Sequence, residues 1–188
     1  MSSTERDSLR TAATLERSRQ RLARMGAFSF WIQVVLGVTA GLSWIFVIFG
    51  RLFGRFGFSE SAGTNLATIT VFLSLLTLLT SLFFTFRQFK DAQDLNGDRL
   101  SLLAAWMRRL LLVNLAGILL SVISSAAQTG ELLSSTLFGR FSVTFEIPGL
   151  LLAVASTNIT LSHFVSLVFV LWVLGILDQR NPLNNSPS

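Results

Sequence analysis

The stretch from Ile147 to Leu177 reads IPGLLLAVASTNITLSHFVSLVFVLWVLGIL, and none of its 31 residues is Asp, Glu, Lys or Arg. An α-helix rises about 1.5 Å per residue, so roughly 20 apolar residues cross the ~30 Å hydrocarbon core of a bilayer. This stretch is therefore long enough to span a membrane. Three further stretches have comparable length and equally lack charged residues: 25–50, 61–86 and 110–130.

The whole chain is apolar: of its 188 residues, 51% are hydrophobic and only 13% are charged. Soluble domains carry about 25% charged residues, so this composition favours a membrane protein over a soluble domain. We predict an all-α fold, an integral membrane four-helix bundle occupying residues 25–178, between a basic tail at 1–24 and a disordered tail at 179–188. The expected spans are residues 28–50, 65–86, 110–128 and 151–177.

Two segments outside the predicted spans contain both charged and apolar residues. The tail at 1–24 contains six arginines and a weak apolar stripe at Leu9, Leu15 and Leu22, which predicts an interfacial helix leading into the first span. The segment 129–149 places Glu131, among other polar residues, beside apolar ones. A surface loop, an interfacial helix and a partly re-entrant segment are all open interpretations of it.

Lysines and arginines are distributed unequally between the predicted loops. The two tails and the loop at 87–109 together hold 12 of them, whereas the connectors on the other side hold 3. By the positive-inside rule, the N- and C-termini are expected on the cytoplasmic side. Topology thus explains the net charge of +5, and we expect no nucleic-acid partner.

Polar side chains recur at helical spacing in three of the spans. A polar group inside the bilayer costs free energy unless a neighbouring helix bonds to it, so these faces are expected to point inward. They form either an interhelical network that holds the bundle or an oligomer together, or a polar path for a solute. The candidate residues are Asn114, Ser121, Gln128, Asn158, Ser162, His163 and Ser166.

The first span instead offers a pair of small residues, Gly37 and Gly41. A spacing of four places both on one helix face, where they allow a close approach of another backbone. We interpret them as candidate helix-packing residues.

His163 is the single histidine of the chain and lies within the fourth span. Neutral imidazole offers one donor and one acceptor, and Asn114 is its expected partner. Three roles stay open: a structural hydrogen bond, a contact with an ion or proton, and axial ligation of a bound metal ion or pigment. The chain has no cysteine and no acid–base or nucleophile constellation, so we do not expect an enzyme.

Two motifs carry a family resemblance: GAFSFWIQ at residues 26–33 and ASTNITLSHFVSLV at residues 155–168, with Val113, Asn114 and Gly117 between them. They resemble the chloroplast inner-envelope family called permease in chloroplasts, whose plant member is also named as the twenty-one-kilodalton subunit of the Tic translocon. The most specific part is the Asn-x-x-x-Ser-His-Phe sequence of the fourth span.

The resemblance implies an integral membrane protein with one of two functions. One is a metal-ion permease or channel-like component with iron as solute, for which His163 is the candidate metal contact. The other is a non-catalytic accessory subunit of a protein-import translocon or a photosynthetic assembly. The short, partly acidic N-terminal tail favours a cyanobacterial plasma or thylakoid membrane over a plastid envelope. Membrane lipid, further copies of the chain and a larger membrane complex are the expected partners.

Overall fold

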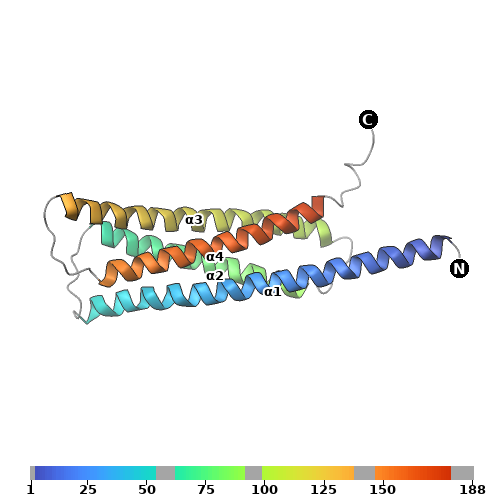
Figure 1. Cartoon of the computed structure of the whole chain (residues 1–188), viewed down its shortest axis with the longest axis horizontal. Coiled ribbons are helices and arrows are strands. Elements are labelled where there is room, and N and C mark those ends of the chain that lie inside the picture. The colour runs from blue at the N-terminus through green and yellow to red at the C-terminus, as the bar shows by residue number, and fades with distance from the viewer. Residues whose placement is uncertain (1–2, 54–61, 92–98, 138–146, 179–188) are drawn as a thin grey trace, which may run out of the picture.

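The structure, a computed structural model, describes residues 3–53, 62–91, 99–137 and 147–178. These residues form α-helices and no strand, which confirms the predicted all-α class with four helices (Figure 1). The helices are α1 (Ser3–Leu52), α2 (Ala62–Asp91), α3 (Arg99–Leu137) and α4 (Ile147–Asp178).

The helices pack side by side with successive directions reversed, so that the start of α1 and the end of α4 lie at the same end of the bundle (Figure 1). Helices α2 and α4 contact each other and both remaining helices. Among the described residues, α1 and α3 do not contact one another. The pair α2 and α4 therefore forms the middle of the bundle, with α1 and α3 on either side.

Each helix is long and apolar enough to cross a membrane, and the apolar parts extend one to six residues beyond the predicted spans, except that the fourth ends one residue earlier. They are Arg24–Leu52, Gly63–Arg87, Ala105–Ser134 and Pro148–Ile176. The basic tail forms the first part of α1 and is continuous with the first span, rather than a separate helix. Similarly, much of the expected polar loop at 87–109 belongs to α2 and α3.

The segment 129–149, for which three interpretations were open, begins as a continuation of α3 up to Leu137. The hydroxyl of Thr64 donates to Oε2 of Glu131 at 2.7 Å and so ties this end of α3 to α2. Helix α4 starts at Ile147 with Pro148 in its first turn, where proline favours helix initiation. Residues 138–146, like the tail at 179–188, lie outside the described residues.

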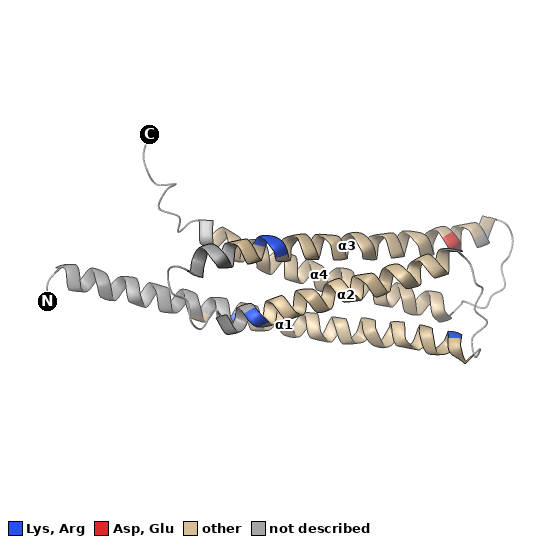
Figure 2. Ribbon diagram, turned by 180° about the vertical axis from the view of Figure 1, so that it is seen from behind, with Lys and Arg blue, Asp and Glu red and all other residues tan. Residues whose placement is uncertain are grey.

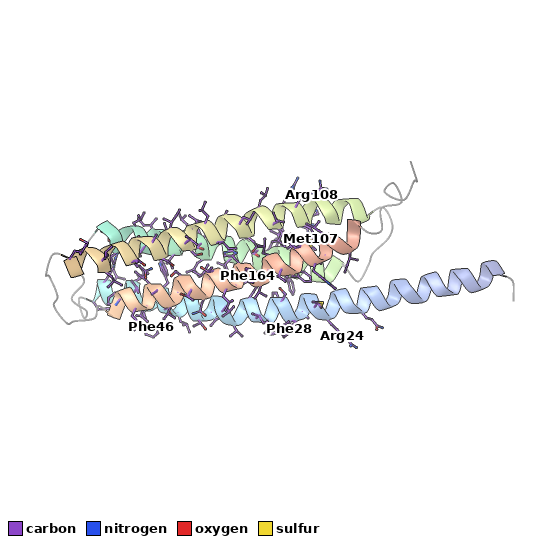
Figure 3. All side chains as sticks on the ribbon, turned by 45° about the horizontal axis from the view of Figure 1, so that its top comes forward. Arg24, Phe28, Phe46, Met107, Arg108 and Phe164 are labelled. Carbon is purple, nitrogen blue, oxygen red and sulfur yellow. The ribbon has the colours of Figure 1, made fainter. Side chains whose placement is uncertain are left out.

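The outer surface of the bundle is apolar along its length. Phe28 and Phe46 project away from the bundle (Figure 3), with exposed fractions of 69% and 60%, and Phe164 is 54% exposed. The charged residues coloured in Figure 2 lie near the two ends of the part where the four helices pack together. This distribution matches a bilayer and shows that the four helices contact membrane lipid.

Two apolar clusters lie inside the bundle. One includes Ala40, Val71 and Ile159 and joins α1, α2 and α4. The other cluster joins α3 and α4 near the end of the bundle where Met107 is labelled in Figure 3, and consists of Met107, Leu110, Val170 and Val173. We call these four residues the apolar seal.

Candidate functional site

The amide of Asn114 is the point at which α2, α3 and α4 meet. Its Nδ2 donates to Oγ of Ser166 at 2.9 Å, and its Oδ1 accepts from Oγ of Ser81 at 3.0 Å. The two serine hydroxyls lie 3.1 Å apart, which closes a ring of three hydrogen-bonded side chains. All three side chains are fully buried. Each helix thus supplies one member of the ring.

The orientation of the Asn114 amide also fixes how His163 is bonded. Nδ2 donates to the carbonyl of Leu110 at 2.9 Å, which an amide oxygen could not do, so Oδ1 faces Nδ1 of His163 at 2.9 Å. Since Oδ1 only accepts, Nδ1 must carry a hydrogen. In the neutral imidazole, Nε2 is then an acceptor.

Nε2 of His163 faces α2, where Oγ1 of Thr77 lies 3.2 Å away. The same hydroxyl lies 2.7 Å from the carbonyl of Ser74. A hydroxyl has one hydrogen, so Thr77 can donate to only one of these two acceptors at a time. Nδ1 of His163 is thus bonded to Asn114, whereas Nε2 receives a hydrogen bond only when the Thr77 hydroxyl turns toward it from Ser74. The imidazole ring is completely buried.

A glycine makes room for the imidazole. A Cβ atom added at Gly117 would overlap Nε2, Cε1 and Cδ2 of His163. The carbonyl of Gly117 also accepts a hydrogen bond of 2.8 Å from Oγ of Ser74. Any side chain at position 117 would displace the ring, so Gly117 determines where His163 lies.

Further polar pairs continue from His163 toward the Glu131 end of α3. Oγ of Ser121 lies 2.8 Å from Oγ1 of Thr160, and Oγ of Ser125 donates to Ser156 at 3.2 Å. We refer to this set of side chains as the polar column. In order from the Glu131 end it comprises Glu131, Thr64, Ser125, Ser156, Ser121, Thr160, Ser74, Thr77, His163, Asn114, Ser81 and Ser166.

The structure brings together four of the predicted site residues. Asn114, His163 and Ser166 lie in the central network, and Ser121 lies further along the polar column. Gln128 is buried but donates to Ser124 of its own helix at 3.1 Å. The remaining two predicted residues, Asn158 and Ser162, make no interhelical bond in the structure.

Asn158 lies outside the network because its amide donates to the carbonyl of Val154, one turn earlier in α4, at 2.8 Å. Ser162 is fully buried, yet its hydroxyl has no partner. Oε1 of Gln33 in α1 is likewise buried without a partner, although its Nε2 donates to Ser29 at 3.0 Å. The central network therefore does not include α1.

The two candidate packing glycines differ. A Cβ atom at Gly37 would lie 3.1 Å from Cδ2 of Leu78, so this glycine allows α1 to approach α2 closely. Gly41 has nothing within 4 Å of its Cβ position. Of these two candidates, only Gly37 is thus in a close helix contact within the bundle.

Ser74, Thr77, Ser81 and Gly117 belong to the inward-facing stripes that the sequence predicts in the second and third spans, but they were not among the candidate site residues, although all four contact or complete the network. The intervals between these residues in the sequence already indicated that they share a helix face with other polar residues. Ser74, Thr77 and Ser81 follow one another at intervals of three and four, and Gly117 lies three residues after Asn114. Such intervals place residues on one helix face.

The described residues show no cluster of ligands for a resident metal ion. They contain no group of three or more His, Cys, Asp or Glu side chains that could hold a metal ion. Axial ligation by His163 would also displace Asn114 or Thr77 from one of its nitrogens. The arrangement instead offers neutral hydroxyl and amide groups, one imidazole and, at one end, a single carboxylate.

Comparison with known proteins identifies the family. A family model described as protein of unknown function (DUF3611) matches residues 12–178, which includes all four membrane helices. Searches of curated proteins and of solved structures gave no match. Since the family model covers most of the chain, the protein is a member of the DUF3611 family.

Proposed function

We propose that the protein is a membrane transport component that conducts a cation along the polar column between α2, α3 and α4. The observation that carries the proposal is the buried imidazole of His163 within the fourth membrane helix, whose two ring nitrogens lie 2.9 Å from Asn114 and 3.2 Å from Thr77. Ionisable residues inside membrane helices are costly and commonly mark ion or proton pathways. The family resemblance in residues 26–33 and 155–168 supports a metal ion, with iron as the solute.

The chemical groups of the polar column change along its length. Glu131 places a carboxylate at one end, hydroxyl oxygens follow, and the imidazole of His163 lies deeper. Ferrous ion favours imidazole and carboxylate ligands. Beyond the ring of Asn114, Ser81 and Ser166, the apolar seal occupies the Met107 end of α3 and α4. Conduction therefore requires the helices at the seal to separate.

Flux measurements test this function directly. The purified chain is reconstituted into vesicles loaded with a dye that is quenched by ferrous or manganous ion. We expect metal-dependent quenching, and His163→Ala should slow it by about tenfold or more because the path loses its one imidazole. Asn158→Ala, outside the network, is the matched control and should retain the flux. Equal rates in protein-free vesicles would refute the transport function.

A second candidate, a non-transporting accessory subunit, is supported by a different observation. His163 and Ser81 are both bonded to Asn114, so the network joins three helices without a solute. Interhelical hydrogen bonds of this kind hold membrane helices together. Under this hypothesis the apolar outer face packs against a translocon or a photosynthetic assembly. Mild purification should then recover stoichiometric partner subunits or pigment, and a colourless homo-oligomer would contradict it.

We further propose that the termini face the cytoplasm of a cyanobacterial-type plasma or thylakoid membrane. The excess of Lys and Arg in the tails and the loop at 87–109 supports this orientation.

A further inference from the structure

Asn158 carries an amide on the outside of the bundle, near the middle of a membrane helix. It lies four residues, or about 6 Å, before the midpoint of the apolar segment Pro148–Ile176. Its Nδ2 donates to the carbonyl of Val154, which uses one of the two amide hydrogens. Among the described residues, the second hydrogen and Oδ1 have no partner. The side chain is partly exposed, and Oδ1 is not one of the buried atoms that lack a bond, so this oxygen reaches the outer surface.

The exposed threonines of the membrane helices differ from Asn158 in this respect. The hydroxyls of Thr39, Thr80 and Thr157 each donate to the carbonyl four residues earlier, at 3.0, 2.9 and 2.9 Å. A hydroxyl has one hydrogen, so these threonines leave no donor unpaired. The Asn158 amide leaves both a donor and an acceptor facing acyl chains, which offer no hydrogen bonds, and this costs free energy. Asn158 therefore favours a polar partner from outside the chain.

A stripe of residues on the outer face of α4 surrounds this amide. Intervals of three and four residues alternate along it, and none of its members is buried. The exposed fractions of Val154, Leu161 and Val168 are 38%, 48% and 51%. A seven-residue repeat of this kind forms a seam along which a second helix packs in a left-handed crossing. We call this set of residues the α4 stripe; it comprises Leu151, Val154, Asn158, Leu161, Val165 and Val168.

A second copy of the chain has the surface that matches this stripe. Two copies inserted with the same topology are related by a two-fold axis along the membrane normal, so their α4 helices are parallel. In a parallel pair, equivalent residues of the seam meet across the axis, and the two Asn158 side chains then lie at the same depth. The second N–H of each amide can donate to Oδ1 of the other, which satisfies both groups. An unrelated helix would match only if it carried such a polar group at that depth.

We propose that the α4 stripe is the interface of a parallel homodimer, in which the two Asn158 amides bond to each other within the membrane. A single asparagine in an otherwise apolar seam also fixes the register of the two helices. The polar column lies inside each copy, so pairing is independent of whether the protein conducts a cation. Unfolding of the separated chain in excess detergent is likewise independent of pairing.

Cysteine cross-linking tests the interface, because the chain contains no cysteine of its own. In membranes of the expressing cells, where all copies share one topology, Leu161→Cys should give a disulfide-linked dimer on oxidation with copper phenanthroline. Leu119→Cys is the matched control, since Leu119 is 62% exposed and lies close to the middle of Ala105–Ser134 in α3. It should give about a tenth as much dimer or less. Equal yields at the two positions, or no dimer with Leu161→Cys, would overturn the proposal.

Self-association of the full chain in phosphatidylcholine bilayers tests the role of the amide. Energy transfer between copies labelled at the N-terminus gives the dissociation constant of the dimer as a mole fraction. Asn158→Leu should raise this constant by about fivefold or more, because two interhelical hydrogen bonds are lost. Thr80→Val removes an exposed hydroxyl whose hydrogen is used within α2 and should leave the constant unchanged. An unchanged constant in Asn158→Leu would refute the amide pair, and a chain that stays single at every mole fraction would show that lipid covers the stripe instead.

Discussion

Oδ1 of Asn114 lies 2.9 Å from Nδ1 of His163, and the same oxygen accepts a hydrogen bond of 3.0 Å from Ser81. One amide oxygen of α3 thus receives donors from both α4 and α2. The Asn114 Nδ2 adds a third interhelical bond, to Ser166. The register of three helices is therefore determined at a single side chain in the middle of the bundle.

Replacement of Asn114 by leucine should destabilise the bundle more than the same change at Asn158. Asn114→Leu removes three interhelical bonds, each worth about 0.6 kcal/mol in membrane proteins, so a loss of about 2 kcal/mol in unfolding free energy is expected. Asn158→Leu removes only a bond within α4 and should change stability little. Reversible unfolding in mixed micelles measures both. Equal losses of unfolding free energy in the two variants would contradict the inference that the interhelical bonds of Asn114 hold the bundle together.

Gly117→Ala should destabilise the protein, whereas Gly130→Ala in the same helix should not. The new methyl group at position 117 would overlap the imidazole of His163, and overpacking of this kind costs about 1–3 kcal/mol. Position 130 has open space around its Cβ, and alanine favours helix there by up to about 1 kcal/mol. Thermal unfolding in detergent should therefore move in opposite directions for the two variants.

Replacement by alanine should change the stability of the protein differently at two serines that lie four residues apart in α4. Ser166→Ala breaks bonds to Asn114 and Ser81 and leaves buried groups unpaired, at a cost of about 1–3 kcal/mol. Ser162→Ala removes a buried hydroxyl that has no partner, so stability should be unchanged or increased. A loss at Ser162 comparable to that at Ser166 would indicate that its hydroxyl is bonded.

The orientation of the chain in the membrane can be tested because it contains no cysteine. A single cysteine in place of Asn96 should react with an impermeant maleimide only from the cytoplasmic side, since that loop carries the excess of positive charge. A cysteine in place of Ser59 should react only from the opposite side. Reversed labelling would invert the proposed topology.

The number of helices could be predicted because the bilayer demands long runs without charged residues. The helix ends were less predictable. Residues 99–109 contain three arginines, and their polarity resembled a loop, yet they continue α3 in helical form. Hydropathy indicates where a helix lies within lipid, but not how far it extends into water.

Within α4, the helical period already separates a residue that shares the network with His163 from one that lies outside the network. Ser166 is three residues away, about 60° around the helix, whereas Asn158 is five residues away, about 140°. A strict angular criterion would have excluded Asn158 from the network. No such criterion could identify the role of Gly117, because its contact with His163 depends on the atomic fit of two helices.

The lack of contact between α1 and α3 divides the bundle into unequal parts. Directional bonds connect α2, α3 and α4, and they fix both rotation and sliding. Helix α1 meets α2 and α4 mainly through side chains such as Ala40 and Val47, whose dispersion contacts tolerate small shifts. The first helix is thus held by packing against α2 and α4 and by the hydrogen bond from Nε1 of Trp44 to the carbonyl of Thr68 at 3.3 Å, so substitutions at Asn114 should loosen α2, α3 and α4 while leaving the contacts of α1 in place.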